Sequence, residues 1–322
     1  MMEFFRRLAR PRIAVGTMRD ERPAVDFATA NPGVSSQCDW LAIAAQQEPF
    51  RLSRVVLRRD VATRSFTGQT TNVARLAIDV GHLRPGQPVD VVLDGQQISS
   101  IPWPQSGQRL WFERTDTEWR ATESPSPRRK GPDRSGTFKS AFDRRALLVY
   151  GTGGTEEEDR WAEAKARYDA ETFWYRGGGA LEVVRDRDFR AEDTVDRNVI
   201  LYGNADTNSA WPQLLSDCPI QVGRGHVRIR GRSDMVGNVS LLMVYPRADS
   251  DVATIGVVAG TSPMGMALTN RIRYFVSGIP FPDLVIVDAK TWAEGPPPIG
   301  GWGYFGRDWS VENGDFGWRD GL

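Results

Sequence analysis

The chain has 322 residues, 40% of them hydrophobic and 10% aromatic, which is enough for real hydrophobic cores and suggests two domains. Its 41 basic and 41 acidic residues balance, which excludes a global electrostatic attraction to nucleic acid or to an anionic membrane. No apolar run approaches the ~20 residues that a membrane span requires, so we expect neither a membrane span nor a nucleic-acid partner.

Residues 1–22 are predicted to form a short N-terminal helix or extension. Phe4, Phe5 and Leu8 share one helical face, which is typical of a helix that docks on a core; a helix on a membrane surface is the alternative. The segment lacks the continuous apolar stretch and the small-residue cleavage site of a signal peptide.

Residues 23–122 show short apolar–polar alternations separated by turns that contain Pro, Gly, Asn or Asp. Alternation with period two is typical of strands that have one solvated face. Several such strands at this spacing predict an antiparallel β-sandwich. Residues 123–140 are polar, basic and rich in Pro and Gly, and we interpret them as a linker.

Residues 141–295 alternate buried-strand runs with helical segments. Leu147–Tyr150 is followed by a Gly-rich turn and by a helix, in which Thr155 and Glu158 are spaced as a capping box. Trp161, Ala164, Tyr168 and Tyr175 mark one face of this helix. Strand–helix alternation predicts a Rossmann-like, three-layer α/β domain with a mostly parallel sheet. The fold class expected for the whole chain is therefore α and β: a β-sandwich followed by this domain.

The remaining residues, 296–322, are rich in Gly and aromatic residues. We interpret them as a tail that packs against a neighbouring domain, with a ligand-stacking surface as the alternative. Cys38 and Cys218 fall in different predicted domains, so no disulfide framework is expected and the compartment stays open.

Three strands of the second domain end in small-residue turns, at residues 150–154, 202–206 and 259–262. The carboxyl ends of parallel strands meet at one edge of a sheet, where open α/β sheets bind ligands. This edge is the predicted site for a small-molecule ligand, and simple turn chemistry is the alternative interpretation. The candidate ligand-binding residues are Gly151, Thr152, Gly153, Gly154, Gly203, Asn204, Asp206, Asn208 and Thr261.

Motifs for cofactors and metals are missing. Glu156 stands where a dinucleotide-binding motif has its third glycine, and no P-loop lysine follows, so no cofactor is expected. The chain has only two histidines and no neighbouring cysteine or histidine to complete a zinc site. Calcium ligation by the acidic residues of segment 186–193 is an alternative to a solvated loop.

The chain is poor in groups for nucleophilic catalysis. It has no G-x-S-x-G elbow. The one conceivable triad combines Ser262 with His226 and Asp288, or with Asp206 in place of Asp288.

Four segments resemble a bacterial family of large secreted α/β-hydrolases, the prolyl-oligopeptidase-like peptidases and esterases. The matching segments are residues 25–35, 148–155, 198–208 and 305–312. In that family these segments follow the hydrolase domain, and the family's catalytic serine, acid and histidine have no matching positions here. The resemblance implies a soluble, bacterial, secreted protein, although this chain shows no signal peptide. It also implies a hydrolase domain that packs on the N-terminal side.

Two functional hypotheses follow from these observations. The first is a non-catalytic accessory or binding module of a serine hydrolase, with its ligand at the strand-end turns. The second is an independent hydrolase of esterase or lactonase type that uses Ser262 or a metal-bound water.

Overall fold

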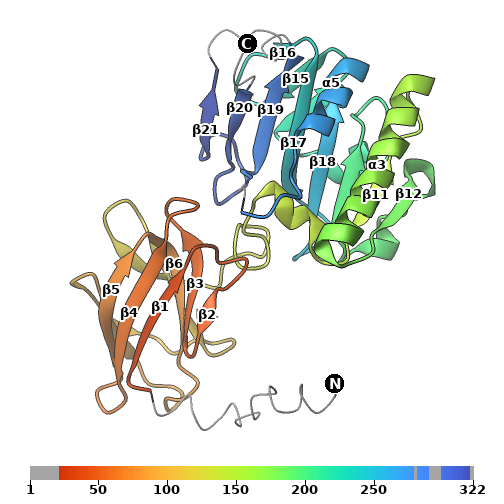
Figure 1. The fold of residues 1–322 in the computed structure, drawn as a ribbon. Helices are drawn as coiled ribbons and strands as arrows, with labels where there is room; N and C mark the ends of the chain where they lie inside the picture. Colours follow the sequence, from red (N-terminus) through yellow and green to blue (C-terminus); the bar gives the residue numbers. More distant parts are fainter. Residues whose placement is uncertain (1–21, 279–280, 290–298, 320–322) are drawn as a thin grey trace, which may run out of the picture. The chain divides into compact units, whose positions relative to one another are not determined.

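The computed structural model describes residues 22–278, 281–289 and 299–319 (Figure 1). The N-terminal helix predicted over residues 1–22 lies outside this range except for Arg22. The chain divides into two units, residues 1–126 and 127–322. The boundary falls within the predicted linker 123–140.

The first unit is built from two five-stranded sheets (Figure 1). One sheet has the order β1 (Ala24–Thr29), β4 (Ser53–Asp60), β5 (Ser65–Thr71), β7 (Val89–Leu93), β8 (Gln96–Ile101). The other has the order β10 (Trp119–Thr122), β9 (Arg109–Arg114), β6 (Val73–Asp79), β3 (Leu41–Gln46), β2 (Gln37–Cys38). Neighbouring strands are antiparallel except for β5 and β7, which are parallel. Leu57 of one sheet and Phe112 of the other are fully buried in one shared core.

The second unit contains an eight-stranded sheet and a small three-stranded sheet. The large sheet has the order β12 (Glu182–Arg185), β11 (Leu147–Tyr150), β13 (Val199–Tyr202), β18 (Thr254–Gly260), β17 (Val239–Pro246), β19 (Leu284–Asp288), β20 (Ile299–Tyr304), β21 (Asp315–Trp318). The small sheet has the order β14 (Ile220–Gly223), β15 (His226–Ile229), β16 (Met235–Val236). The described α-helices are α3 (Glu156–Gly177), α4 (Trp211–Leu215) and α5 (Pro263–Leu268), beside 3-10 turns at Phe138–Phe142, Asp186–Asp188, Glu192–Thr194 and Thr269–Arg271.

The predicted Rossmann-like domain with a mostly parallel sheet is wrong. Of the described residues, 39% are in strands and 17% are in helices, so the structure is mostly β. Only β12, β11, β13 and β18 run parallel, whereas β17, β19, β20 and β21 join the sheet by antiparallel pairing. The physical reason lies in the connections, because β17 reaches β18 through a short loop and has no room for the crossover helix that parallel pairing requires.

Two further segments differ from expectation. The predicted tail, residues 296–322, contains the antiparallel pair β20 and β21 at the edge of the sheet, where no strand was predicted from the sequence. Part of the predicted linker belongs to the second unit, because the buried guanidinium of Arg134 donates to the carbonyl oxygens of Arg247 and Ala253. Cys38 is partly exposed, Cys218 is buried, and both thiols are free.

Helix α3 lies beside α5 on one face of the large sheet (Figure 1). It begins with the predicted capping box, in which the Thr155 hydroxyl accepts from the Glu158 amide and the Glu158 carboxylate accepts from the Thr155 amide. It ends at Gly178, whose φ of 65° places it in the left-handed region that suits glycine.

The face that α3 buries is different from the one its aromatic residues predicted. Tyr168 and Tyr175 are exposed, whereas Lys165 and Asp169 are buried. The Lys165 ammonium donates to Asp169 Oδ1 over 2.7 Å, and the hydroxyls of Tyr202 and Tyr274 both donate to Asp169 Oδ2. The buried Asp169 carboxylate thus forms an ion pair with Lys165 and accepts hydrogen bonds from two tyrosine hydroxyls inside the second unit. Burial raises the pKa of Asp169.

Candidate functional site

The strand-end turns predicted as a ligand site come together at one edge of the large sheet. The parallel register aligns Tyr150 with Tyr202 and Tyr202 with Val258, so the turns after β11, β13 and β18 are neighbours. The Gly151 amide donates to the Tyr202 carbonyl over 2.9 Å, and the Gly203 amide donates to the Val258 carbonyl over 3.2 Å.

The side chains at this edge are used to fasten the turns to one another. Asn208 is buried and donates to the carbonyl oxygens of Val149 and Tyr202, each over 3.0 Å. Asn204 is buried and donates to the Gly260 carbonyl over 2.8 Å. A ligand that used these amides would have to break hydrogen bonds that hold three strands in place.

The other predicted polar residues of the edge have internal partners as well. Thr152 donates to Asp186 Oδ1 over 2.6 Å, and the second oxygen of Asp186 accepts from the Ser209 amide. Asp206 accepts from the Arg224 amide over 2.7 Å. The hydroxyl of Thr261 accepts from the Val239 amide and donates to the Gly237 carbonyl.

The glycines of this edge allow close backbone contacts. A Cβ atom on Gly151 would lie 2.4 Å from the Thr207 carbonyl oxygen, and one on Gly153 would lie 3.4 Å from the same oxygen, to which the Gly153 amide donates. Gly203 has a φ of 114°, in the region that favours glycine. Gly151 and Gly203 therefore have a structural reason to be glycine, whether or not a ligand binds, whereas a Cβ on Gly153 would make only an ordinary contact.

The N-terminus of α3 is occupied by the helix's own carboxylates. Asp159 accepts from the Gly154 amide over 2.8 Å, and buried Glu158 accepts from both Thr155 and the Arg224 guanidinium. The hydrogen bonds from Arg224 hold the pKa of Glu158 below its usual value. An anionic ligand at this helix end would meet two negative charges at close range.

The groups of the conceivable triad have other partners. Ser262 is the N-cap of α5: its hydroxyl accepts from the Gly265 amide and donates to Asn238 Oδ1 over 2.6 Å. His226 lies at the start of β15, and its Nδ1 is 3.0 Å from the Arg224 carbonyl oxygen. Asp288 ends β19. The hydrogen bonds of Ser262 and His226 do not join these residues to each other or to Asp288. The described residues therefore do not form the serine–histidine relay that activates a nucleophile.

Within residues 22–278, 281–289 and 299–319, no group of three or more His, Cys, Asp or Glu side chains is placed to hold a metal ion. Asp186, the first residue of the acidic segment considered for calcium, is bonded to Thr152 and Ser209 instead. None of the helices in these ranges is both long enough and apolar enough to cross a membrane.

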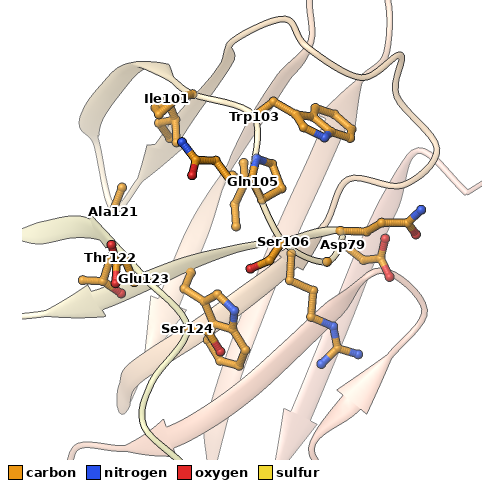
Figure 2. A pocket seen from close by; sticks show the side chains of 16 residues that line it. Asp79, Ile101, Trp103, Gln105, Ser106, Ala121, Thr122, Glu123 and Ser124 are labelled. Carbon is orange, nitrogen blue, oxygen red and sulfur yellow. The ribbon is translucent and has the colours of Figure 1, made fainter.

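A pocket of about 1180 Å³ lies in the first unit, at the point where the chain passes from one sheet of the sandwich to the other (Figure 2). Its lining comes from the end of β6, the connection between β8 and β9, the first half of β9, and the end of β10 with the residues after it. Figure 2 shows Ile101 and Trp103 on one side and Thr122 to Ser124 on another, with Gln105 and Ser106 between them.

Most of the uncharged polar side chains of this pocket, unlike those of the strand-end edge, form no hydrogen bond to the described residues, whereas Asp79 and Arg109 do have partners. Among the described residues no side-chain hydrogen bond is formed by Gln105, Ser106, Gln108, Thr122 or Ser124, or by the indoles of Trp103 and Trp111. Residues 105–108 of the connection are exposed, whereas Trp103, Pro104 and Trp111 are partly buried. The pocket therefore offers hydrogen-bonding groups and aromatic surface to a ligand, which the strand-end edge does not.

The sequence did not identify this pocket. Its residues carry no motif, and they come from four segments that only the crossing between the sheets brings together. One signal was present: Trp103 stands between two prolines in a connection of Gln, Ser and Gly residues, away from any strand periodicity. In the structure Trp103 packs against the core of the first unit and stays partly exposed at the pocket.

Comparison of the sequence with models of known protein families gave no match, and comparison with curated protein sequences gave no match either.

Proposed function

We propose that this chain is a non-catalytic binding module whose ligand site is the pocket between β6, β9, β10 and the β8–β9 connection. The observation that supports the proposal is a contrast between the strand-end edge and the pocket. At the strand-end edge the polar side chains are used by internal hydrogen bonds, whereas seven aromatic or polar side chains around the pocket form no side-chain hydrogen bond to any described residue. A concave surface with aromatic walls and a few polar groups is the usual form of a small-molecule site.

The absence of a formed relay at Ser262 supports a binding role over a catalytic one. The Ser262 hydroxyl is engaged as a helix cap and by Asn238, and His226 faces a carbonyl oxygen. That the module serves a hydrolase is the part of the proposal that rests on the resemblance to the prolyl-oligopeptidase-like family alone. A ligand at the strand-end turns also stays a prediction.

The proposal is tested by a thermal-shift screen of the purified chain. The panel contains neutral oligosaccharides, acidic oligosaccharides, proline-rich peptides, nucleotides and acyl compounds. A ligand that binds the native state adds about 2.7 kcal/mol at a concentration one hundred times its Kd, which raises the melting temperature of the first unit. We expect a hit whose effect is lost in Trp103→Ala and kept in Trp174→Ala, because Trp174 is an exposed tryptophan outside the pocket.

Two results would contradict the proposal. One is a panel in which no compound raises the melting temperature through the pocket. The other is turnover of p-nitrophenyl esters or aminoacyl nitroanilides that disappears in Ser262→Ala or after EDTA treatment, which would establish the independent hydrolase instead. Unchanged background rates after both treatments would remove the hydrolase hypothesis.

A further inference from the structure

The structure assigns a neutral saccharide to the pocket of the first unit. This inference rests on the proposed function and goes further by naming the chemical class of the ligand. The aromatic walls, the uncharged hydrogen-bonding groups, the charge and the size of the pocket support it.

Two tryptophans supply the aromatic surface. Trp103 lies in the β8–β9 connection and Trp111 lies on β9. The guanidinium of Arg64 stands 5.7 Å from the centre of the Trp103 ring and is itself bonded to the carbonyl oxygens of Gln87 and Pro88. The Trp103 ring is thereby held in place before a ligand arrives, which lowers the entropy cost of binding. An indole combines a flat apolar face with an N–H donor, and sugar rings likewise have an apolar C–H face and a polar edge.

The remaining groups match the polar edge of a sugar. Gln105, Ser106, Gln108, Thr122 and Ser124 are amides and hydroxyls, and every one of them can both donate and accept a hydrogen bond. Sugar hydroxyls have the same double capacity. Because these five side chains have no partners among the described residues, a saccharide can bond to them without breaking a bond of the protein.

The charged groups disfavour an anion. Asp79 and Glu123 are acidic, and Arg109 is the one basic residue of the lining. The Arg109 guanidinium donates to Gln37 Oε1 over 2.7 Å, so part of its donor capacity is already used. Nucleotides, phosphates and acidic sugars would therefore meet a net negative lining.

The form of the pocket favours a sugar over a proline-rich peptide. Peptides of that kind dock on grooves lined mainly by aromatic side chains, whereas here uncharged polar groups outnumber the two tryptophans. The volume of about 1180 Å³ is slightly larger than that of most small-molecule pockets, which leaves room for more than one sugar ring.

The test is isothermal titration of the full chain with tetrasaccharides of glucose in α- and β-linkage, of xylose and of N-acetylglucosamine. A uronic-acid tetrasaccharide and a proline-rich peptide are titrated alongside them. We expect at least one neutral tetrasaccharide to bind, Trp103→Ala to weaken it at least tenfold, and Gln105→Ala with Ser106→Ala to weaken it several-fold. Gln105 and Ser106 are exposed loop residues, so their replacement tests the site even where Trp103→Ala disturbs folding. Trp174→Ala is the matched control and should bind as the unaltered chain does.

The possible failures are distinguishable. If only the peptide, the uronic-acid tetrasaccharide or another compound binds, and Trp103→Ala abolishes it, the saccharide inference is overturned and the binding module stands. If a neutral sugar binds equally well to Trp103→Ala and to the Gln105→Ala/Ser106→Ala variant, the site is elsewhere and the inference is overturned. If nothing binds at the pocket, both the inference and the proposed function fail.

Discussion

Replacement of Asp169 by Asn should destabilise the second unit strongly. The Asp169 carboxylate is fully buried and accepts hydrogen bonds from Lys165, Tyr202 and Tyr274. Asparagine has nearly the same shape but no charge, so the Lys165 ammonium, which is only 5% exposed, loses its counter-charge. Breaking a buried ion pair on one side costs about 3–5 kcal/mol.

The expected shift follows from this magnitude. With a dependence of unfolding free energy on urea of about 2 kcal/mol per molar, a loss of about 4 kcal/mol lowers the midpoint by about 2 M. Unfolding is followed by circular dichroism and tryptophan fluorescence. Because the chain has two units, their transitions need not coincide. Leu57→Ala, a change in the buried core of the first unit, identifies which transition belongs to that unit.

Two further variants separate the ion pair from local disturbance. Replacing both partners, as Lys165→Met with Asp169→Leu, removes the charges together and should recover part of the loss, although the two tyrosine hydroxyls lose their acceptor. Glu163→Gln breaks the exposed pair with Arg167 and should change the free energy by less than about 0.5 kcal/mol. A midpoint for Asp169→Asn within about 0.3 M of the unaltered chain would refute the reasoning.

Three other predictions concern the strand-end edge and the core of the second unit. Arg224 lowers the pKa of Glu158 in the folded state. The ionised Glu158 carboxylate therefore stabilises the folded state above the unfolded pKa of about 4.3, and this stabilisation is lost as the pH falls toward the folded pKa. Urea midpoints measured from pH 7 to pH 3 should therefore fall less steeply in Glu158→Gln than in the unaltered chain. Gly151→Ala should lower the free energy of unfolding by about 1–3 kcal/mol in the same urea assay, because its Cβ would lie 2.4 Å from the carbonyl oxygen of Thr207. An unchanged urea midpoint would contradict this close contact. Burial raises the pKa of the Cys218 thiol to about 12, so mass spectrometry should find it unmodified by iodoacetamide at pH 8 in the native chain and modified once the chain is unfolded.

Local signals in the sequence were reliable where local chemistry decides the structure. The capping box of Thr155 and Glu158 and the glycine stop at the end of α3 follow from side chains within a few residues of each other. The aromatic face of α3 failed as a guide to burial. The apolar period placed Tyr168 and Tyr175 together, but the helix buries Lys165 and Asp169 because each neutralises the other, and a hydropathy pattern does not detect such a pair.

Features that depend on contacts between distant segments could not be predicted from the sequence. The buried-strand runs predicted within residues 141–295 include residues 241–245, which lie in β17, but nothing within such a run indicates whether its neighbours run parallel or antiparallel. That direction is set by the length of the loop to β18 and by the later arrival of β19. The order of strands and helices predicted that the strand-end turns meet at one edge of the sheet. The sequence could not predict that the side-chain amides of Asn204 and Asn208 would donate their hydrogen bonds to backbone carbonyl oxygens. The pocket depends on segments far apart in the chain and gave no motif.

The buried carboxylate of Asp283 joins the beginning of the second unit to its last strands. It accepts from the Lys130 ammonium and the Thr137 amide on one side of the sequence, and from the Phe305 amide on the other. During synthesis the second unit cannot close this junction until Phe305 has left the ribosome, whereas the sheets of the first unit are complete by Thr122. Shortening the chain before Phe305 should therefore leave the sandwich intact and the second unit open to proteolysis.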